Sequence, residues 1–235
     1  MKTNWSLALK NELWELHEEN PGWSTRKLAE EMGLPFGPVD NALYKLKCER
    51  KETWLQSARL GFFDIEAGDL NANVGYMLSW ALLMPDDTVK SDVITKKEIF
   101  SGVMDKRIVR SALRAIQDID VLVTFYGTGF DVPYLRARAL VHGLPYPGYG
   151  QILHLDVLYT ARRLLKLSNR RMGTAAAFLG LEEKDFYDVA VWNRARLGDK
   201  EALGHILSHN ERDVRITKQL WMVLAPYVKG IRKSI

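Results

Sequence analysis

The first 48 residues carry apolar side chains at the spacing of helices. Leucine and tryptophan residues recur at positions 7, 9, 13, 14 and 16, and the Asn20-Pro21-Gly22 triplet ends this segment. A second helix is predicted to follow, with Ser24 or Thr25 as its N-cap. The glycine- and proline-containing stretch 33–37 breaks it, and a third helix is predicted to begin at Pro38.

Three helices with a glycine-containing turn before the last follow the order of a helix-turn-helix domain. We therefore predict a small all-α, helix-turn-helix-like domain over residues 1–48. Lys45 and Lys47 lie toward the end of its candidate recognition helix and are candidate nucleic-acid contacts. The alternative is a scaffold that packs against the rest of the chain or against a protein partner, and the nearly balanced charge of the block keeps it open.

Beyond a polar connector, residues 49–60, the pattern changes to alternating strands and helices. The apolar runs FFDIEA, VGYMLSWALL and VLVTFYG predict strands, and HLDVLYTARRLL predicts the end of a strand that leads into a helix. Helices are predicted within TKKEIFSGVMDKRIVRSALRAI, PYLRARALVHG and HNERDVRITKQLWMVL. Residues 61–235 are therefore predicted to form an α/β domain.

The composition is that of an ordinary globular protein, 47% hydrophobic and 26% charged. No apolar run reaches the roughly 18 residues of a membrane span, and the amphipathic N-terminus does not resemble a signal peptide. Cys48 is the single cysteine, so neither an internal disulfide nor a zinc site of several cysteines is expected, and a cytoplasmic location is predicted. A net charge of +4 permits a nucleic-acid partner, and the oligomeric state stays open.

Two acids alternate with apolar residues in the first strand of this domain. Side chains of a strand alternate between its faces, so Asp64 and Glu66 are expected to point to one side and Phe63 and Ile65 to the other. Neighbouring carboxylates repel each other unless a cation lies between them, and Mg²⁺ or Mn²⁺ prefers such oxygen ligands. The alternative is a solvated strand face.

Two further segments carry acids that the fold could bring close to this pair, one after a predicted strand and one in the last predicted helix. Asp131 follows the strand VLVTFYG at the rim of the predicted sheet, where α/β proteins bind ligands, unless it only caps the next helix. His209 and Asp213 are four residues apart and share one face of the last helix. Asp213 could bind a metal while His209 acts as a general base, or the two could form a surface pair.

A basic run without acids extends over residues 159–180. Its cations could follow a phosphate backbone, or they could simply form a solvated helix face. They are Arg162, Arg163, Lys166, Arg170 and Arg171. Asp156, just before this run, is interpreted as auxiliary to the site or as the N-cap of the following helix.

Together these segments resemble the DEDD superfamily of 3′–5′ exonucleases, which has a ribonuclease H-like fold. FFDIEA is similar to the first motif, YGTGFDVPYL to the second and HNERDVRITKQL to the third. The resemblance covers roughly residues 60–225 and is greatest to the YprB-like ribonuclease H-like family, which also has a counterpart of HLDVLYTARRLLKL. It implies a mixed sheet flanked by helices.

Two residues depart from the family pattern. His209 stands where a tyrosine is usual, and families that use histidine as the base place it one residue earlier, at Ser208 in this chain. Tyr126 occupies a place that asparagine often holds, which could alter contacts with the terminal nucleotide.

The resemblance implies a two-metal mechanism and a nucleic-acid substrate, with DNA preferred over RNA. Two Mg²⁺ or Mn²⁺ ions, about 3.5–4 Å apart, would be held by Asp64, Glu66, Asp131 and Asp213, one activating water and the other stabilising the leaving oxygen. The predicted function is a metal-dependent 3′–5′ DNA exonuclease. The alternatives are a DNA-binding regulator with a non-catalytic nuclease-like domain and a structure-specific endonuclease.

Overall fold

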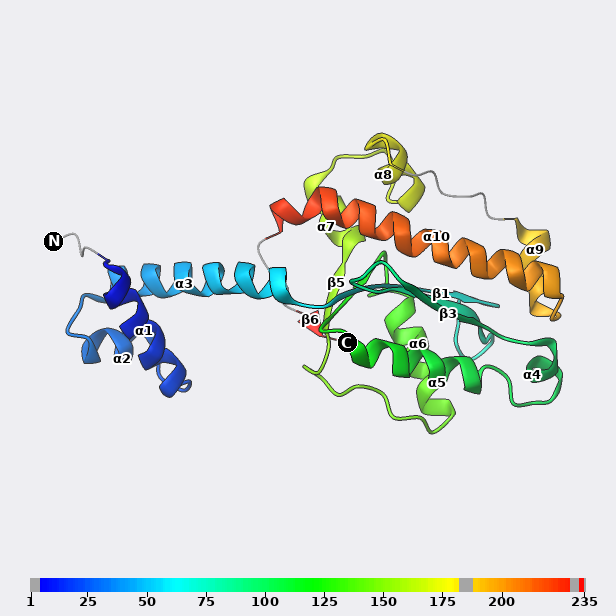
Figure 1. The fold of residues 1–235 in the computed structure, drawn as a ribbon, viewed down its shortest axis with the longest axis horizontal. Helices are drawn as coiled ribbons and strands as arrows, with labels where there is room; N and C mark the ends of the chain where they lie inside the picture. Colours follow the sequence, from blue (N-terminus) through cyan, green and yellow to red (C-terminus); the bar gives the residue numbers. More distant parts are fainter. Residues whose placement is uncertain (1–4, 182–187, 229–232, 235) are drawn as a thin grey trace. The chain divides into compact units, whose positions relative to one another are not determined.

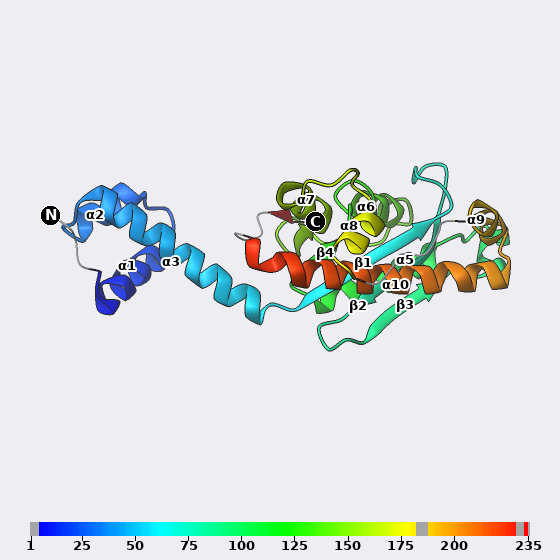
Figure 2. The same cartoon turned by 90° about the horizontal axis from the view of Figure 1, so that it is seen from above.

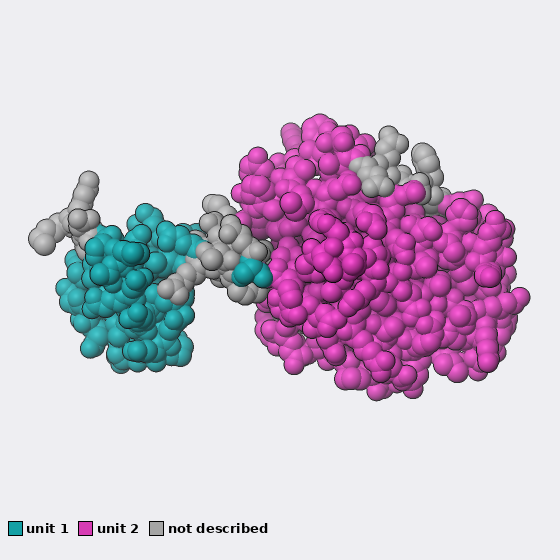
Figure 3. Space-filling model, viewed as in Figure 1, with its two compact units in different colours: residues 1–57 teal, residues 58–235 magenta. Residues whose placement is uncertain are grey.

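The computed structural model describes residues 5–181, 188–228 and 233–234. Two compact units divide the chain, Met1–Ser57 and Ala58–Ile235 (Figure 3).

Three helices form the first unit, α1 (Leu7–Glu19), α2 (Thr25–Glu31) and α3 (Phe36–Ser57). Ser6 and Ser24 cap the first two, because each hydroxyl accepts a hydrogen bond from a backbone N–H of the first turn. The core of the unit consists of apolar side chains from all three helices, namely Leu13, Leu28, Ala29, Val39, Ala42, Leu43 and Leu46.

Helix α3 is longer than the sequence pattern predicted. It begins at Phe36 rather than Pro38, since proline is tolerated within the first turn of a helix. It also continues through residues 49–57 of the predicted connector, a stretch that contains neither glycine nor proline. The turn from α2 to α3 contains Gly33 at a φ of +62°, a conformation that favours glycine.

A mixed sheet of six strands, in the order β3-β2-β1-β4-β5-β6, forms the centre of the second unit. Strands β1, β4 and β5 are parallel, whereas β2, β3 and β6 each run antiparallel to a neighbour. The strands are β1 (Leu60–Ala67), β2 (Met77–Leu83), β3 (Val89–Val93), β4 (Val121–Thr124), β5 (Leu153–Asp156) and β6 (Lys233–Ser234).

Helices cover both faces of this sheet, with α10 along one face and α5 and α6 on the other (Figures 1 and 2). The helices of the unit are α4 (Lys96–Phe100), α5 (Lys106–Ala115), α6 (Asp131–Val141), α7 (Val157–Leu164), α8 (Met172–Phe178), α9 (Val189–Arg196) and α10 (Lys200–Leu224). Short 3₁₀ turns follow α5 and α10, at Ile116–Asp118 and Ala225–Tyr227. A helical block that precedes a mixed, helix-flanked sheet confirms the predicted fold class.

The sequence pattern did not predict strands β3 and β6 or helices α8 and α9. Strand β3 has the sequence VKSDV and is half-buried along its whole length, so it lacks the apolar signal of the central strands. Helix α10 begins at Lys200, nine residues before the predicted segment, with Asp199 as its N-cap.

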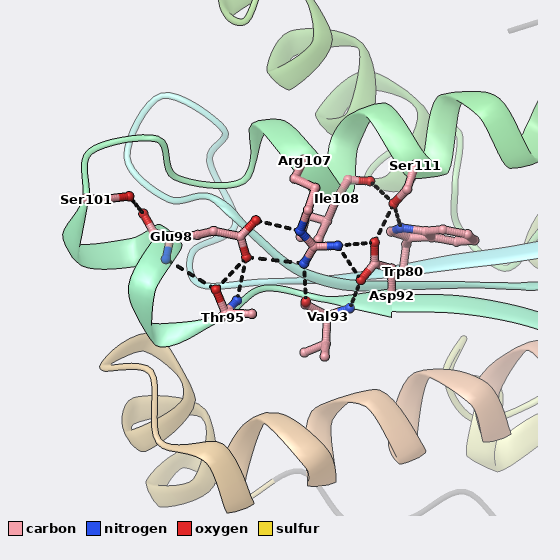
Figure 4. A network of polar contacts seen from close by, with 9 residues as sticks. All are labelled: Trp80, Asp92, Val93, Thr95, Glu98, Ser101, Arg107, Ile108 and Ser111. Carbon is pink, nitrogen blue, oxygen red and sulfur yellow. Dashed lines mark hydrogen bonds and ion pairs between the residues drawn. The ribbon is translucent and has the colours of Figure 1, made fainter.

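Arg107 joins strand β3 to helices α4 and α5 through a network of polar contacts (Figure 4). Its guanidinium donates to the carboxylates of Asp92 and Glu98 and to the carbonyl of Val93. Ser111 of α5 donates to Asp92 and accepts a hydrogen bond from the indole N–H of Trp80. The network therefore connects the antiparallel strands β2 and β3 to helices α4 and α5.

Within the described part of the chain, no helix is both long enough and apolar enough to cross a membrane.

Candidate metal and nucleic-acid site

In strand β1, alternation places Asp64 and Glu66 on the side opposite Phe63 and Ile65. Phe63 and Ile65 are buried in the core, whereas Asp64 and Glu66 are half-buried. Glu66 approaches His209 of helix α10, and Asp64 lines a cavity together with Asp213 of the same helix. Strand β1 and helix α10, far apart in the sequence, therefore bring three carboxylates to one face of the sheet.

His209 lies between two of these carboxylates. Its Nε2 atom is 3.7 Å from Oε1 of Glu66 and 3.7 Å from Oδ2 of Asp213. One ligand atom from each of the three residues falls within 4.8 Å of the others. The i,i+4 spacing in α10 brings His209 and Asp213 together, because such residues lie one turn apart on one helix face, and Glu66 approaches them from strand β1.

Asp131 is the first residue of helix α6 and is only 2% exposed. Its Oδ1 accepts a hydrogen bond from the backbone N–H of Ile65 at 2.9 Å, so it contacts the strand between Asp64 and Glu66. Burial is the main cause that raises the pKa of Asp131 to about 7; the hydrogen bond from Ile65 opposes the rise, and the nearby carboxylates of Asp156 and Asp213 add to it. A carboxyl group buried among other acids is one that a cation would stabilise in its charged form.

Asp156 has a role that the sequence suggested only in part. It caps helix α7 by accepting from the N–H of Leu158, as the N-cap interpretation predicted. It also accepts from the N–H groups of Tyr126 and Thr128, both at 2.9 Å. One carboxylate thus joins α7 to the loop that leads from β4 to Asp131.

Helix α9 contributes a residue that the sequence reasoning missed. The ring of Trp192 meets the ring of His209 edge to face, with centroids 5.4 Å apart and an interplanar angle of 89°. Trp192 is buried, so the contact restricts the imidazole on one side. No local signal in the sequence links the two residues, because the contact depends on tertiary packing.

A cavity of about 1230 Å³ joins the acids to part of the basic run. Asp64 and Asp213 line it together with Arg162, Arg170 and Arg171, and Lys166 lines an adjoining pocket with the same three arginines. Arg163 is directed elsewhere, since its Nη2 donates to the carbonyl of Tyr227. Three of the five predicted cations therefore line the cavity with the acids, and a fourth, Lys166, lines the adjoining pocket.

Lys45 and Lys47 of the first unit are both exposed on helix α3. Residues two positions apart point to different sides of a helix, so the two lysines do not share one face.

The donor set suits a hard divalent cation. Carboxylate oxygens from β1, α6 and α10 converge on one region, and an imidazole nitrogen lies beside two of them. Oxygen ligands of this kind are preferred by Mg²⁺ and Mn²⁺. The compact group consists of Glu66, Asp213 and His209. Asp64 lies next to it on strand β1, and Asp131 lies at the start of helix α6, which is hydrogen-bonded to the same strand.

Comparison with known families identifies the second unit. A profile of the RNase H superfamily matches residues 61–225, which include all four acids and His209.

Comparison with individual proteins points to DNA polymerases. A DNA polymerase of Methanocaldococcus jannaschii is 30% identical in a region that covers 27% of this chain and 5% of the polymerase. The structure of a family B DNA polymerase from the archaeon Pyrobaculum calidifontis is similar with a TM-score of 0.60 and 21% identity, over 73% of this chain and 25% of that chain. The chain thus spans a minor part of each polymerase, and the structural likeness shows a shared fold.

Proposed function

The chain belongs to the RNase H superfamily, and from that premise we propose that it is a metal-dependent nuclease that removes nucleotides from the 3′ end of DNA. The proposal places it among the DEDD-type exonucleases, in the YprB-like branch. The observation that carries it is the position of His209 Nε2, 3.7 Å from a carboxylate oxygen of Glu66 and from one of Asp213, beside a cavity bordered by arginines.

Four carboxylates would hold two Mg²⁺ or Mn²⁺ ions, those of Asp64, Glu66, Asp131 and Asp213. When bound, such ions make a water molecule more acidic and neutralise negative charge on the reacting phosphate. The fixed positions of these carboxylates matter because preorganised electrostatic stabilisation is usually the largest contribution to catalysis.

His209 is proposed as the general base. Its Nε2 would accept a proton from the attacking water as the water oxygen bonds to phosphorus and the bond from phosphorus to the 3′ oxygen breaks. The leaving 3′ oxygen then takes a proton from solvent. Trp192 keeps the imidazole beside Glu66 and Asp213 through the edge-to-face contact.

The cations beside the cavity would bind the substrate backbone. Arg162, Arg170 and Arg171 line the same cavity as Asp64 and Asp213, so a phosphate near the acids would have guanidinium groups within the same space. The first unit is proposed to assist as a helix-turn-helix-like DNA-binding domain, through Lys45 or Lys47.

A cytoplasmic location stays a prediction.

Cleavage of four labelled substrates tests the proposal. DNA and RNA oligonucleotides of one sequence, each labelled at either the 5′ or the 3′ end, are incubated with the full chain and Mg²⁺ or Mn²⁺. A 3′–5′ exonuclease shortens 5′-labelled DNA one nucleotide at a time and releases the 3′ label at once as a mononucleotide.

Other outcomes separate the competing functions. Internal cuts confined to branched or hybrid substrates would favour a structure-specific endonuclease. DNA binding without hydrolysis under any of these conditions would favour the non-catalytic regulator and overturn the proposed activity.

A further inference from the structure

Tyr126 has a backbone conformation that side chains rarely adopt. It follows strand β4 and has a φ of +71°. A left-handed φ is uncommon for residues other than glycine, asparagine and aspartate, and it costs free energy in a bulky residue. Strain of this kind persists only where the surrounding structure enforces it, and it is concentrated at functional sites.

Partly buried hydrogen bonds enforce the conformation of this loop. Oδ1 of Asp156 accepts from the N–H of Tyr126, and Oδ2 of the same residue accepts from the N–H of Thr128. The carbonyl of Tyr126 accepts from the N–H groups of Gly129 and Phe130. The backbone on both sides of the tyrosine is therefore fixed, by Asp156 at the end of strand β5 and by the loop residues just before helix α6.

The ring of Tyr126 packs against a glycine and is open to solvent elsewhere. A Cβ atom added to Gly129 would lie 2.5 Å from Cζ of Tyr126, so the ring occupies the space that a side chain at position 129 would need. Yet Tyr126 is 49% exposed and lines the cavity that also contains Asp64, Asp213 and three arginines.

The fold alone gives little reason for an aromatic ring at this position. Asparagine or glycine would satisfy the same backbone hydrogen bonds with less strain. A half-exposed ring recovers only part of the free energy that full burial would supply. A ligand that covers the exposed part of the ring would supply the remainder.

We infer that Tyr126 is a stacking platform for the base of the 3′-terminal nucleotide, an inference that rests on the proposed nuclease function. Within one cavity, the acids would face the scissile phosphate, the arginines the backbone and the tyrosine the base. Because every base has a π-face, stacking on Tyr126 makes the site require a terminal base without selecting among bases.

Binding of paired oligonucleotides tests this inference without relying on cleavage. A fluorescent single-stranded DNA is compared with the same strand carrying an abasic residue at its 3′ end, by anisotropy in Ca²⁺, with strand integrity checked on a gel. The full chain is expected to bind the abasic strand roughly fivefold to a hundredfold more weakly, the range of one base–aromatic stack. An abasic residue at the 5′ end is expected to have no effect.

Variants of the loop test whether the Tyr126 ring causes the preference for the strand with a 3′-terminal base. Tyr126→Asn keeps a residue that tolerates the left-handed φ, and it is expected to bind both strands equally. Tyr126→Phe retains the ring and is expected to keep the preference. Gly129→Ala, which displaces the ring, is expected to reduce the preference, whereas Tyr149→Asn, at an 89% exposed tyrosine outside the cavity, should leave it unchanged.

Two results would overturn the inference while leaving the proposed function intact. One is hydrolysis by the full chain with equal binding of the normal and abasic strands, and the other is a Tyr126→Asn variant that keeps the preference. A full chain that neither binds nor cleaves DNA would overturn both proposals together.

Discussion

Asp131 accepts a hydrogen bond from the backbone N–H of Ile65, and this bond fixes the start of helix α6 to strand β1 between Asp64 and Glu66. The carboxyl group is almost fully buried, and burial raises its pKa to about 7 from an ordinary value of 3.8. The bond therefore holds in place a carboxyl group whose charged form is energetically unfavourable in the metal-free protein.

The stability of the metal-free protein should therefore depend on pH through Asp131. A carboxyl whose pKa is higher in the folded than in the unfolded state contributes stability below pH 4 that is lost as the pH rises through about 7. The free energy of unfolding of wild type and of Asp131→Asn is measured with urea in EDTA at pH 5 and pH 8. From pH 5 to pH 8, the difference between wild type and variant is expected to shift against wild type by roughly 1 to 4 kcal/mol.

Addition of Mn²⁺ supplies the matching control. A cation beside the charged carboxylate removes the penalty, so the gain in melting temperature on adding Mn²⁺ is expected to be larger at pH 8 than at pH 5. An Asp131→Asn variant with the same pH profile as wild type would contradict the assignment.

Asp64→Asn is expected to reduce hydrolysis by orders of magnitude and to leave the fold intact. Asp64 is half-buried in the cavity wall, and asparagine has the same shape but lacks the negative charge of a metal ligand. Loss of one preorganised electrostatic contact should lower the cleavage rate by roughly 10² to 10³ or more. The rate is measured on end-labelled DNA, alongside the melting temperature in EDTA.

The melting temperature separates loss of chemistry from loss of structure. In EDTA it should stay the same or rise, since the substitution removes a like charge from beside Glu66. A variant that cleaves at the wild-type rate would exclude Asp64 as a ligand.

Asp156→Asn should lower the free energy of unfolding and the activity, because it loosens the loop before Asp131. The carboxylate accepts from the N–H groups of Tyr126, Thr128 and Leu158, and an amide with one oxygen cannot accept from all three in this geometry. Hydrogen bonds to charged groups contribute roughly 1.5–3 kcal/mol each, so the free energy of unfolding is expected to fall by about that amount.

Activity should fall together with stability, and a matched variant provides the comparison. Asp86 accepts from Thr88 in the exposed turn between β2 and β3, outside the cavity. Asp86→Asn should change both the cleavage rate and the free energy of unfolding little. Equal effects of the two substitutions would refute the role of Asp156 in holding the loop.

The motif-bearing parts of the site could be predicted because their geometry is local. Alternation in FFDIEA placed Asp64 and Glu66 on one side of a strand, and the i,i+4 spacing placed His209 beside Asp213. Both patterns act within a single element, where backbone geometry fixes the direction of each side chain.

The remaining parts depend on packing between elements and could not be predicted in this way. The edge-to-face contact of Trp192 with His209 joins residues of α9 and α10, and the bonds of Asp156 to the Tyr126 loop join α7 to β4. Arg163 belongs to the basic run by composition, yet its contact with the Tyr227 carbonyl depends on where the chain returns after α10.

The contribution of the first unit can be tested by removing its two candidate cations. If Lys45 or Lys47 neutralises a phosphate, the Lys45→Ala/Lys47→Ala variant should bind duplex DNA more weakly. The slope of log affinity against log salt should also become shallower, by about 1 for each phosphate that is no longer neutralised. Because the two lysines point to different sides of α3, a change of about 1 is expected rather than 2.

A double substitution of two exposed arginines on α5, Arg110→Ala/Arg114→Ala, provides the charge-matched control. Helix α5 lies on the face of the sheet opposite α10 (Figure 1), so the control should leave affinity and slope unchanged. If the lysine variant behaves like this control, these lysines do not bind DNA.

His209→Phe separates the two roles open to the residue, base and metal ligand. Phenylalanine keeps an aromatic ring against Trp192 but has no nitrogen to accept a proton. Loss of a general base should lower kcat by roughly 10² to 10⁴. The affinity for Mn²⁺, measured by calorimetry, should change far less than in Asp213→Asn, because Asp213 supplies a charged oxygen. If the two variants weaken Mn²⁺ binding equally, His209 is a metal ligand, and another residue must act as the base.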